Sequence, residues 1–192
     1  MSTAVEVRYT PEQYLALERK AEFRSEYIDG GIYPMSGASR FHNVIAGNLY
    51  TLFRAHLRGG GGQAFMSDMR VRVVPGGLYT YPDVVAVVGE ARFEDTQADT
   101  LLNPTVIIEV LSPSTEAYDR GAKFESYRRL DSLQEYLLVS QERVHVERYV
   151  RRGEDWLLTE FGSRDEVLRF ELIDCDVTLI DVYEETPLAG QG

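Results

Sequence analysis

Apolar spacing and capping signals predict two helices in the first third of the chain. Over residues 39–57 apolar side chains recur every three or four positions, which is typical of a long amphipathic helix. Ser39 stands where its N-cap would be. A shorter helix is predicted over residues 11–19, because Thr10 and Gln13 have the spacing of a capping box.

Alternating and clustered apolar positions predict two β-hairpins in the same region. Residues 26–33 place two β-prone runs around a glycine-containing turn. Residues 69–73 alternate between apolar and polar side chains, and a second apolar run covers residues 78–88. A proline- and glycine-rich turn at residues 75–77 joins these two runs, so we predict a second hairpin.

A central strand is predicted over residues 104–111, which are apolar on both faces except for Glu109. After a loop rich in serine, proline and threonine, Asp119 is expected to cap a helix running over residues 119–130. Strand character resumes over residues 135–139. A strand, a helix and a second strand in this order predict a parallel pair of strands.

The last third of the chain is predicted to be mainly β-structure. Strands are expected over residues 144–150, 156–161 and 167–170, and a last turn over residues 181–185. The sequence has no internal repeat, and its four-glycine run is too short to separate domains. We therefore predict one domain over residues 1–192 of mixed α/β (α+β) class, with a mixed central β-sheet flanked by helices and extra C-terminal strands.

Composition narrows the function classes. The single cysteine, Cys175, excludes an internal disulfide and a cysteine-based zinc site, and it fits a reducing compartment. Residues 1–8 lack the basic and apolar segments of a leader, and no stretch is apolar enough to cross a membrane, so we expect a cytoplasmic protein. The net charge of −11 opposes non-specific adhesion to nucleic acid or anionic lipid. Binding to DNA would therefore need a locally basic surface.

The interior carboxylate Glu109 is the strongest sign of chemistry, because an unpaired buried charge is costly. It should have a cationic or metal partner. Asp83 occupies a comparable place in the preceding apolar run, and two converging carboxylates suit a hard cation such as Mg²⁺. Asp119, Lys123 and Tyr127 recur at four-residue intervals on one helix face that should lie near Glu109.

Several strings of the sequence resemble a known family. Tyr81-Pro82-Asp83 followed by Val-Ile-Ile-Glu109-Val-Leu resembles the motif of the PD-(D/E)xK restriction-endonuclease-like superfamily. Longer strings resemble the Uma-two family of bacterial endonucleases: Glu26-Tyr-Ile-Asp-Gly-Gly-Ile-Tyr, Ser67-Asp-Met-Arg-Val-Arg-Val, Glu109-Val-Leu-Ser-Pro-Ser-Thr, Asp119-Arg-Gly-Ala-Lys123-Phe-Glu-Ser-Tyr127-Arg and Glu135-Tyr-Leu-Leu-Val. The resemblance covers roughly residues 10–183 and implies a restriction-endonuclease-like core.

The resemblance also implies a site and an activity. Asp83 and Glu109, with the carbonyl group of Val110, would hold Mg²⁺ or Mn²⁺, and Glu26 would be an auxiliary acid. The activity implied is that of a Mg²⁺-dependent endodeoxyribonuclease, in which a metal-activated water hydrolyses a phosphodiester bond of DNA.

The sequence departs from the superfamily motif at one position. Leu111 stands where the superfamily has a lysine, and a leucine side chain cannot hold or polarise a water. Some members of the superfamily place this lysine on a following helix, and Lys123 stands where the Uma-two pattern has it, so the resemblance implies Lys123 as the catalytic cation. Four further residues are candidates for contacts around the site or with the substrate: Asp119, Tyr127, Arg70 and His42.

Other interpretations of these residues stay open at this point. Glu109 could pair with an arginine as a structural ion pair, Glu26 could pair with Arg24, and Asp83 could cap a strand. The whole chain could be a non-catalytic interaction module that retains a nuclease fold. A glycosidase acid and base pair is a third hypothesis, without a sugar-stacking pattern to support it. An enzyme of this size that cuts both DNA strands would need two active sites, so we expect a homodimer.

Overall fold

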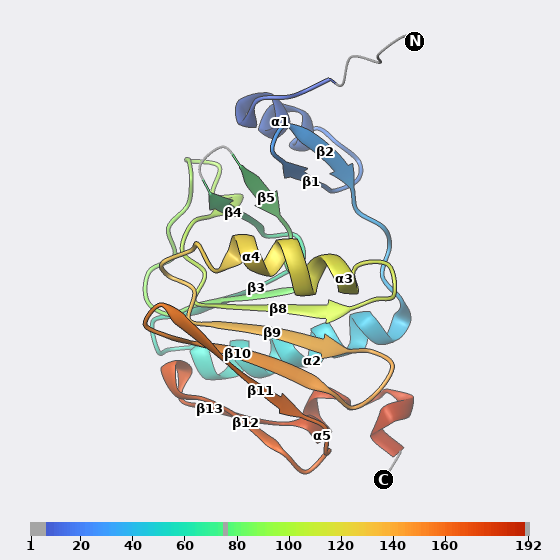
Figure 1. Ribbon diagram of the computed structural model, residues 1–192. Helices are drawn as coiled ribbons and strands as arrows, with labels where there is room; N and C mark the ends of the chain where they lie inside the picture. The colour runs from blue at the N-terminus through green and yellow to red at the C-terminus, as the bar shows by residue number, and fades with distance from the viewer. Residues whose placement is uncertain (1–6, 75–76, 191–192) are drawn as a thin grey trace.

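The computed structural model of the protein describes residues 7–74 and 77–190, and is built around two β-sheets (Figure 1). The larger sheet has the strand order β11-β10-β9-β8-β6-β3. Its strands are β3 (Gln63–Met66), β6 (Val84–Val87), β8 (Val106–Leu111), β9 (Glu135–Ser140), β10 (Val146–Arg152) and β11 (Asp155–Phe161). Only β8 and β9 are parallel in it, so the predicted mixed sheet and its predicted parallel pair are both confirmed.

The smaller sheet has the order β2-β1-β5-β4-β7. Its strands are β1 (Ser25–Ile28), β2 (Gly31–Pro34), β4 (Arg70–Val74), β5 (Leu78–Thr80) and β7 (Thr100–Leu101). Asp29 and Gly30 both have positive φ angles, 45° and 96°, which is the requirement of the tight turn that closes the first hairpin. A separate C-terminal hairpin joins β12 (Val167–Phe170) to β13 (Cys175–Thr178).

Helices cover both sheets. The helix α1 (Pro11–Glu18) packs on the smaller sheet, where Tyr14 stacks on Tyr27. The other helices are α2 (Arg40–Leu57), α3 (Glu116–Tyr118), a π-helical turn (Asp119–Lys123), α4 (Phe124–Tyr127) and α5 (Leu179–Val182), with 3₁₀ turns at Glu171–Ile173 and Pro187–Gly190. The helix α2 and the β12–β13 hairpin pack on one face of the larger sheet, and the segment from α3 to α4 packs on the other together with the smaller sheet (Figure 1). None of the described helices is long and apolar enough to cross a membrane.

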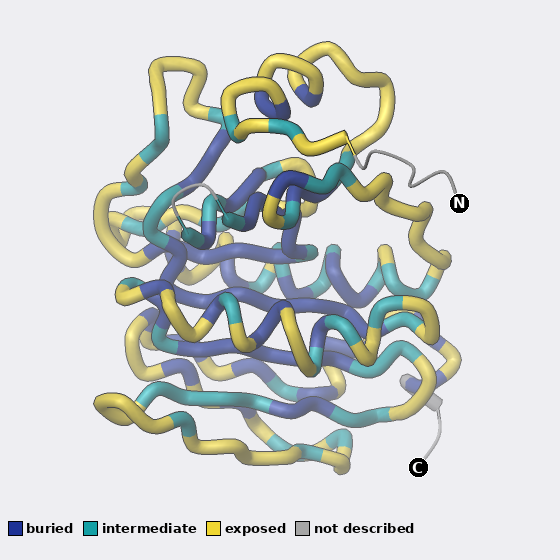
Figure 2. Tube along the Cα trace, turned by 45° about the horizontal axis from the view of Figure 1, so that its top comes forward, coloured by how far each residue is buried: buried dark blue, intermediate teal, exposed yellow. Residues whose placement is uncertain are grey.

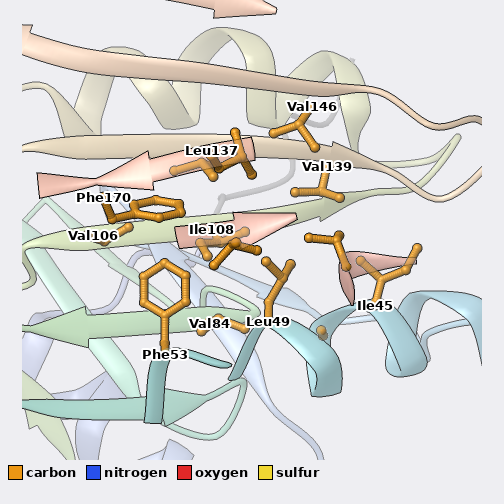
Figure 3. Packing of buried hydrophobic residues seen from close by; sticks show 14 of the residues in the cluster. Ile45, Leu49, Phe53, Val84, Val106, Ile108, Leu137, Val139, Val146 and Phe170 are labelled. Atoms are coloured by element: carbon orange, nitrogen blue, oxygen red, sulfur yellow. The ribbon is translucent and has the colours of Figure 1, made fainter. Parts of the chain in front are cut away.

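Side chains of β8 alternate between these two layers. Val106, Ile108 and Val110 belong to the core beneath α2, where Phe53 packs edge-on against Phe170 with their ring centroids 4.8 Å apart (Figure 3). The other set belongs to the core beneath α4. The strands at the middle of the molecule are accordingly buried, and the exposed positions concentrate in the connecting loops (Figure 2). Glu109 has the parity that points toward α4.

The second predicted hairpin is only half correct. The strands β4 and β5 pair as expected, but the apolar run over residues 78–88 is two strands that belong to different sheets. It breaks at Tyr81-Pro82, because proline lacks the N–H group that a continuing strand would donate. The predicted turn at residues 75–77 falls largely on Pro75 and Gly76, which lie outside the described residues.

The predicted start of the third helix is wrong. Asp119 does not cap a helix: the helical segment begins three residues earlier at Glu116, with Thr115 at its N-cap position. The side chain of Asp119 points to a lysine in the next turn and not to the backbone. The helix ends at Tyr127, short of the predicted residue 130. The turn predicted over residues 181–185 is present as the end of α5 and the turn residues that follow it.

An arginine and carboxylate network ties the end of α1 to the segment before β7. Arg19 donates to Asp99 through Nε and Nη2 at 2.8 and 2.9 Å, and to Asp95 at 2.7 Å. Arg70, which is 3% exposed, places Nη2 3.0 Å from Asp99 Oδ1. The hydrogen bonds from Arg19 hold the pKa of Asp99 well below its usual range, against a smaller opposing effect of burial.

Asp99→Asn should therefore lower the free energy of unfolding at pH 7 by about 1 kcal/mol, a modest value because the Asp99 side chain is 35% exposed and water screens it. Because folding depresses the pKa of Asp99, its stabilising effect is present above a pH of about 4 and is lost as the pH falls. The difference between wild type and variant should shrink between pH 5 and pH 2 in urea unfolding. The exposed control Asp165→Asn should show no such trend, and a difference that is constant with pH would contradict the assignment.

Candidate active site

A cleft of about 1180 Å³ opens at the carboxyl end of β8. The segment linking β2 to α2 and the segment linking β8 to α3 both border it, and they run down the same side of the molecule in Figure 1. All four residues predicted to be catalytic line this one cleft, together with Asp119: Glu26, Asp83, Glu109 and Lys123. The fold therefore gathers residues that are up to 97 positions apart in the chain.

The ammonium group of Lys123 lies among three carboxylates. Its Nζ atom is 3.0 Å from Glu109 Oε1, 3.2 Å from Glu26 Oε1 and 3.4 Å from Asp119 Oδ1. Lys123 is 5% exposed and Glu109 4%, so the contacts lie in a largely water-excluded place. Since an ammonium has three N–H donors, these three carboxylates can occupy all of them.

The hydroxyl groups of Tyr127 and Thr80 form hydrogen bonds to two of these carboxylates. The Tyr127 hydroxyl group donates to Glu109 Oε1 at 2.9 Å and lies 3.3 Å from Thr80 Oγ1. Thr80 in turn donates a short hydrogen bond to Glu26 Oε1. Because both hydroxyl groups are fully buried, they restrict the rotamers of Glu109 and Glu26.

Asp83 is held by the backbone of the neighbouring strand and by a histidine. Its Oδ2 atom accepts from the Val110 N–H group at 2.7 Å and lies 3.1 Å from His42 Nε2. Ser39 accepts a hydrogen bond from the His42 backbone N–H group as the N-cap of α2, which brings His42 to the cleft. Among the described residues every hydrogen bond and ion pair of Asp83 uses Oδ2, so Oδ1 is available to a ligand.

The electrostatics of the cluster favour extra positive charge. Burial raises the pKa of Glu109 well above its usual value, and the charges of Asp119 and Asp83 add to this while Lys123 opposes it. Burial by itself would lower the pKa of Lys123, but the three carboxylates outweigh it and the pKa is raised. The lysine is therefore charged at neutral pH, and Glu109 tends to take up a proton when no other cation is near.

His42 lies against Asp83 at the edge of this cluster. Burial acts to lower the pKa of its imidazole, but the hydrogen bond and charge of Asp83 outweigh that effect and the pKa is raised. The Nδ1 atom is buried and has no hydrogen-bond partner within the described part of the chain. The sequence placed His42 among the candidates, and the structure brings it into contact with Asp83.

The described carboxylates of the cleft do not form a closed cage of three ligands. In the described ranges, one group of three His, Cys, Asp or Glu ligand atoms lies within 4.8 Å of one another, and it is His145, Glu147 and Glu160, outside the cleft. In that group Arg120 already pairs with Glu147. Mg²⁺ is commonly held by one or two carboxylates, with waters and substrate phosphates as its other ligands. Asp83 and Glu109 can supply such a pair.

The structure places one of the candidate residues away from the cleft. Arg70 lies in a smaller cavity of about 310 Å³, where it donates to Thr100 and Tyr81 and pairs with Asp99. The interpretation of Glu26 as a partner of Arg24 does not fit, because Arg24 pairs with Asp68 and Glu26 faces Lys123.

Sequence reasoning missed two residues of the site: Tyr118, which lines the cleft, and Thr80, which is buried next to it. Thr80 carries no motif of its own, and its only signal is that it is polar within an apolar run. Tyr118 immediately precedes Asp119, and its ring centroid lies 5.7 Å from Lys123 Nζ, a cation–π distance. The contact of Thr80 with Glu26 depends on the pairing of β1 with β5, and that of Tyr118 with Lys123 depends on the π-helical turn between them.

Comparisons with known proteins show which family and which proteins this chain is similar to. The family model Uma2, described as "Putative restriction endonuclease", matches residues 11–180. Two uncharacterized proteins of Synechocystis sp. are similar in sequence: slr1290 is 41% identical over 161 residues, covering 83% of this chain and 84% of its own, and sll1609 is 38% identical over 165 residues, covering 85% and 93%.

The fold is similar to that of a solved structure. A crystal structure described as "a putative nuclease belonging to DUF820", from Anabaena variabilis, superposes with a TM-score of 0.74 at 18% sequence identity. The superposition covers 91% of this chain and 97% of that one. The restriction-endonuclease-like architecture predicted from the sequence is therefore confirmed.

Lys123→Met should lower the free energy of unfolding by about 3–5 kcal/mol, because methionine has similar bulk but leaves buried carboxylates without their cation. The double variant Glu109→Gln/Lys123→Met should recover about 1–3 kcal/mol of that loss, since it removes one of the uncompensated charges. Urea unfolding in the presence of a chelator measures both values.

The chain offers one matched control for this experiment. Lys20, its only other lysine, is exposed, and Lys20→Met should change the stability by less than about 0.5 kcal/mol. If the double variant were as unstable as Lys123→Met, the loss would come from packing and not from unpaired charge.

Proposed function

Because the chain belongs to the Uma2 family, we propose that it is a metal-dependent endonuclease that hydrolyses phosphodiester bonds of DNA. The observation that carries the proposal is the excess of negative charge in the cleft. Four carboxylates, Glu26, Asp83, Glu109 and Asp119, face one lysine and one histidine. Buried carboxylates in such excess need a further cation, and a divalent metal ion supplies the missing charge.

Asp83 and Glu109 are the residues we propose as ligands of Mg²⁺ or Mn²⁺, with the carbonyl group of Val110 as a third. Asp83 immediately precedes β6, Glu109 lies on the neighbouring strand β8 of the larger sheet, and the Val110 N–H group fixes the orientation of Asp83. When bound, the metal would lower the pKa of a coordinated water and withdraw charge from the phosphate.

Lys123 is the group that we propose meets the reacting phosphate. Its three donors are shared among carboxylates, so it can reach a water or a phosphate oxygen only when one of these partners is released. A nucleophilic water would then form a bond to phosphorus as the bond to the leaving sugar oxygen breaks, and its proton would pass to a carboxylate of the cleft. The ammonium would offset the charge that grows on the phosphate oxygens.

The departure at Leu111 is compatible with this role for Lys123. Leu111 is 5% exposed and packs in the core beneath α4, so its side chain makes no polar contribution. The lysine that the superfamily motif has there is supplied instead from the π-helical turn, Asp119–Lys123. Turns of this kind are frequent at functional sites. The homodimer and the cytoplasmic location expected from the sequence stay predictions.

The test is cleavage of supercoiled plasmid and of single-stranded DNA with Mg²⁺ or Mn²⁺. Asp83→Asn and Glu109→Gln should each lower the rate at least about 100-fold, since each removes a proposed ligand while keeping its shape. Glu125→Gln, an exposed carboxylate on α4, is the matched control and should cut at the wild-type rate. A chelator should abolish cleavage by the wild-type protein.

Two outcomes would contradict the proposal. Variants as active as the wild type, or cleavage that survives the chelator, would place the chemistry elsewhere. A wild-type protein that cuts neither DNA with either ion, and binds neither ion in calorimetry, would instead be a non-catalytic module that retains a nuclease fold.

A further inference from the structure

The mouth of the cleft carries exposed apolar side chains from four separate segments. They are Phe23 from the link between α1 and β1, Tyr33 from β2, Met35 from the link between β2 and α2, and Met66 at the end of β3. Their exposed fractions are 77%, 52%, 37% and 40%, and we call them the apolar rim. Apolar groups that gather around one cleft mark a binding surface more often than isolated ones do.

The charge of the cleft is unsuited to a DNA duplex. Six of the described lining residues are acidic: Glu26, Asp68, Asp83, Glu109, Asp119 and Glu142. Of the cationic side chains among the described lining residues, Lys123 is buried, and Arg24 is exposed but paired with Asp68 at 3.3 Å. A duplex presents about one negative charge per 1.7 Å, and proteins bind it by neutralising many phosphates with lysine and arginine.

We propose that the cleft takes an unpaired DNA strand, whose bases stack on the apolar rim while one phosphate reaches Lys123 and the carboxylates. This inference rests on the proposed nuclease function and narrows its substrate to single-stranded DNA or to frayed and flapped ends. Unstacked bases offer π faces that pack on aromatic and apolar side chains. A single strand carries about one negative charge per 3.4 Å, half the charge density of a duplex, so fewer cations are needed to neutralise it.

The aromatic members of the apolar rim can be removed without disturbing the fold, because both are more than half exposed. Phe23→Ala/Tyr33→Ala should weaken binding of a single-stranded oligonucleotide about 10- to 100-fold, as expected for the loss of one or two stacked bases. Phe23→Trp/Tyr33→Phe keeps both rings and should bind like the wild type. Leu158→Ala, which removes an exposed apolar side chain outside the cleft, should also bind like the wild type.

Binding is measured by fluorescence anisotropy with Ca²⁺ in place of Mg²⁺, using one labelled strand alone and the same strand in a duplex. The single strand should bind at least about tenfold more tightly than the duplex, the ratio expected from one stacked base. A duplex that binds as tightly as the strand, or rim variants that bind the strand like the wild type, would overturn the inference.

The salt dependence gives a second test. If stacking dominates, the logarithm of the association constant should fall with the logarithm of the salt concentration at a slope no steeper than about −2. A slope steeper than about −5 would indicate a phosphate-binding surface and overturn the inference. If the protein cuts duplex DNA and the rim variants cut it like the wild type, this inference fails but the proposed function stands. If the protein cuts neither duplex nor single-stranded DNA, the proposed function and this inference both fail.

Discussion

The buried ammonium group of Lys123 is the interaction on which the cleft depends. Its three carboxylate partners come from three parts of the fold: Glu26 from the smaller sheet, Glu109 from the larger sheet and Asp119 from the helical segment between β8 and β9. Without a shared cation these carboxylates would repel one another in a place where water cannot screen them. The lysine therefore joins the two sheets at the same point at which it collects acidic groups.

The interruption between β5 and β6 at Tyr81-Pro82 makes this contact between the two sheets possible. Residues on either side of this interruption belong to different sheets. Within a few residues the chain therefore passes from the smaller sheet, which contains Glu26, to the larger sheet, which contains Glu109. Thr80 donates to Glu26 just before the interruption, and Asp83 accepts from Val110 just after it. The proline that ends one strand and the aspartate that opens the next are thus structural parts of the cleft as well as its candidate chemistry.

Much of this arrangement could be predicted because it is local in sequence. The apolar run around Glu109 indicated a covered strand with an interior charge, and the four-residue spacing of Lys123 and Tyr127 placed both on the face that meets it. The start of that helix was misjudged because aspartate is a frequent N-cap residue, and only tertiary structure shows that Asp119 turns toward a buried lysine. The contact between Thr80 and Glu26 depends on the pairing of β1 with β5 in the smaller sheet, and no local periodicity encodes a pairing between residues 54 positions apart.

The choice of lysine in the cleft follows from the geometry of its partners. The chain has twenty cationic residues and only two are lysines, so arginine is its usual cation. The planar guanidinium of arginine suits a single carboxylate that accepts two parallel hydrogen bonds, as Asp99 does from Arg19. Three carboxylates that converge on one atom need a compact charge whose donors can turn independently. The same property would let Lys123 exchange one carboxylate for a phosphate oxygen while it stays bound to the others, and the planar fork of arginine does not allow that exchange.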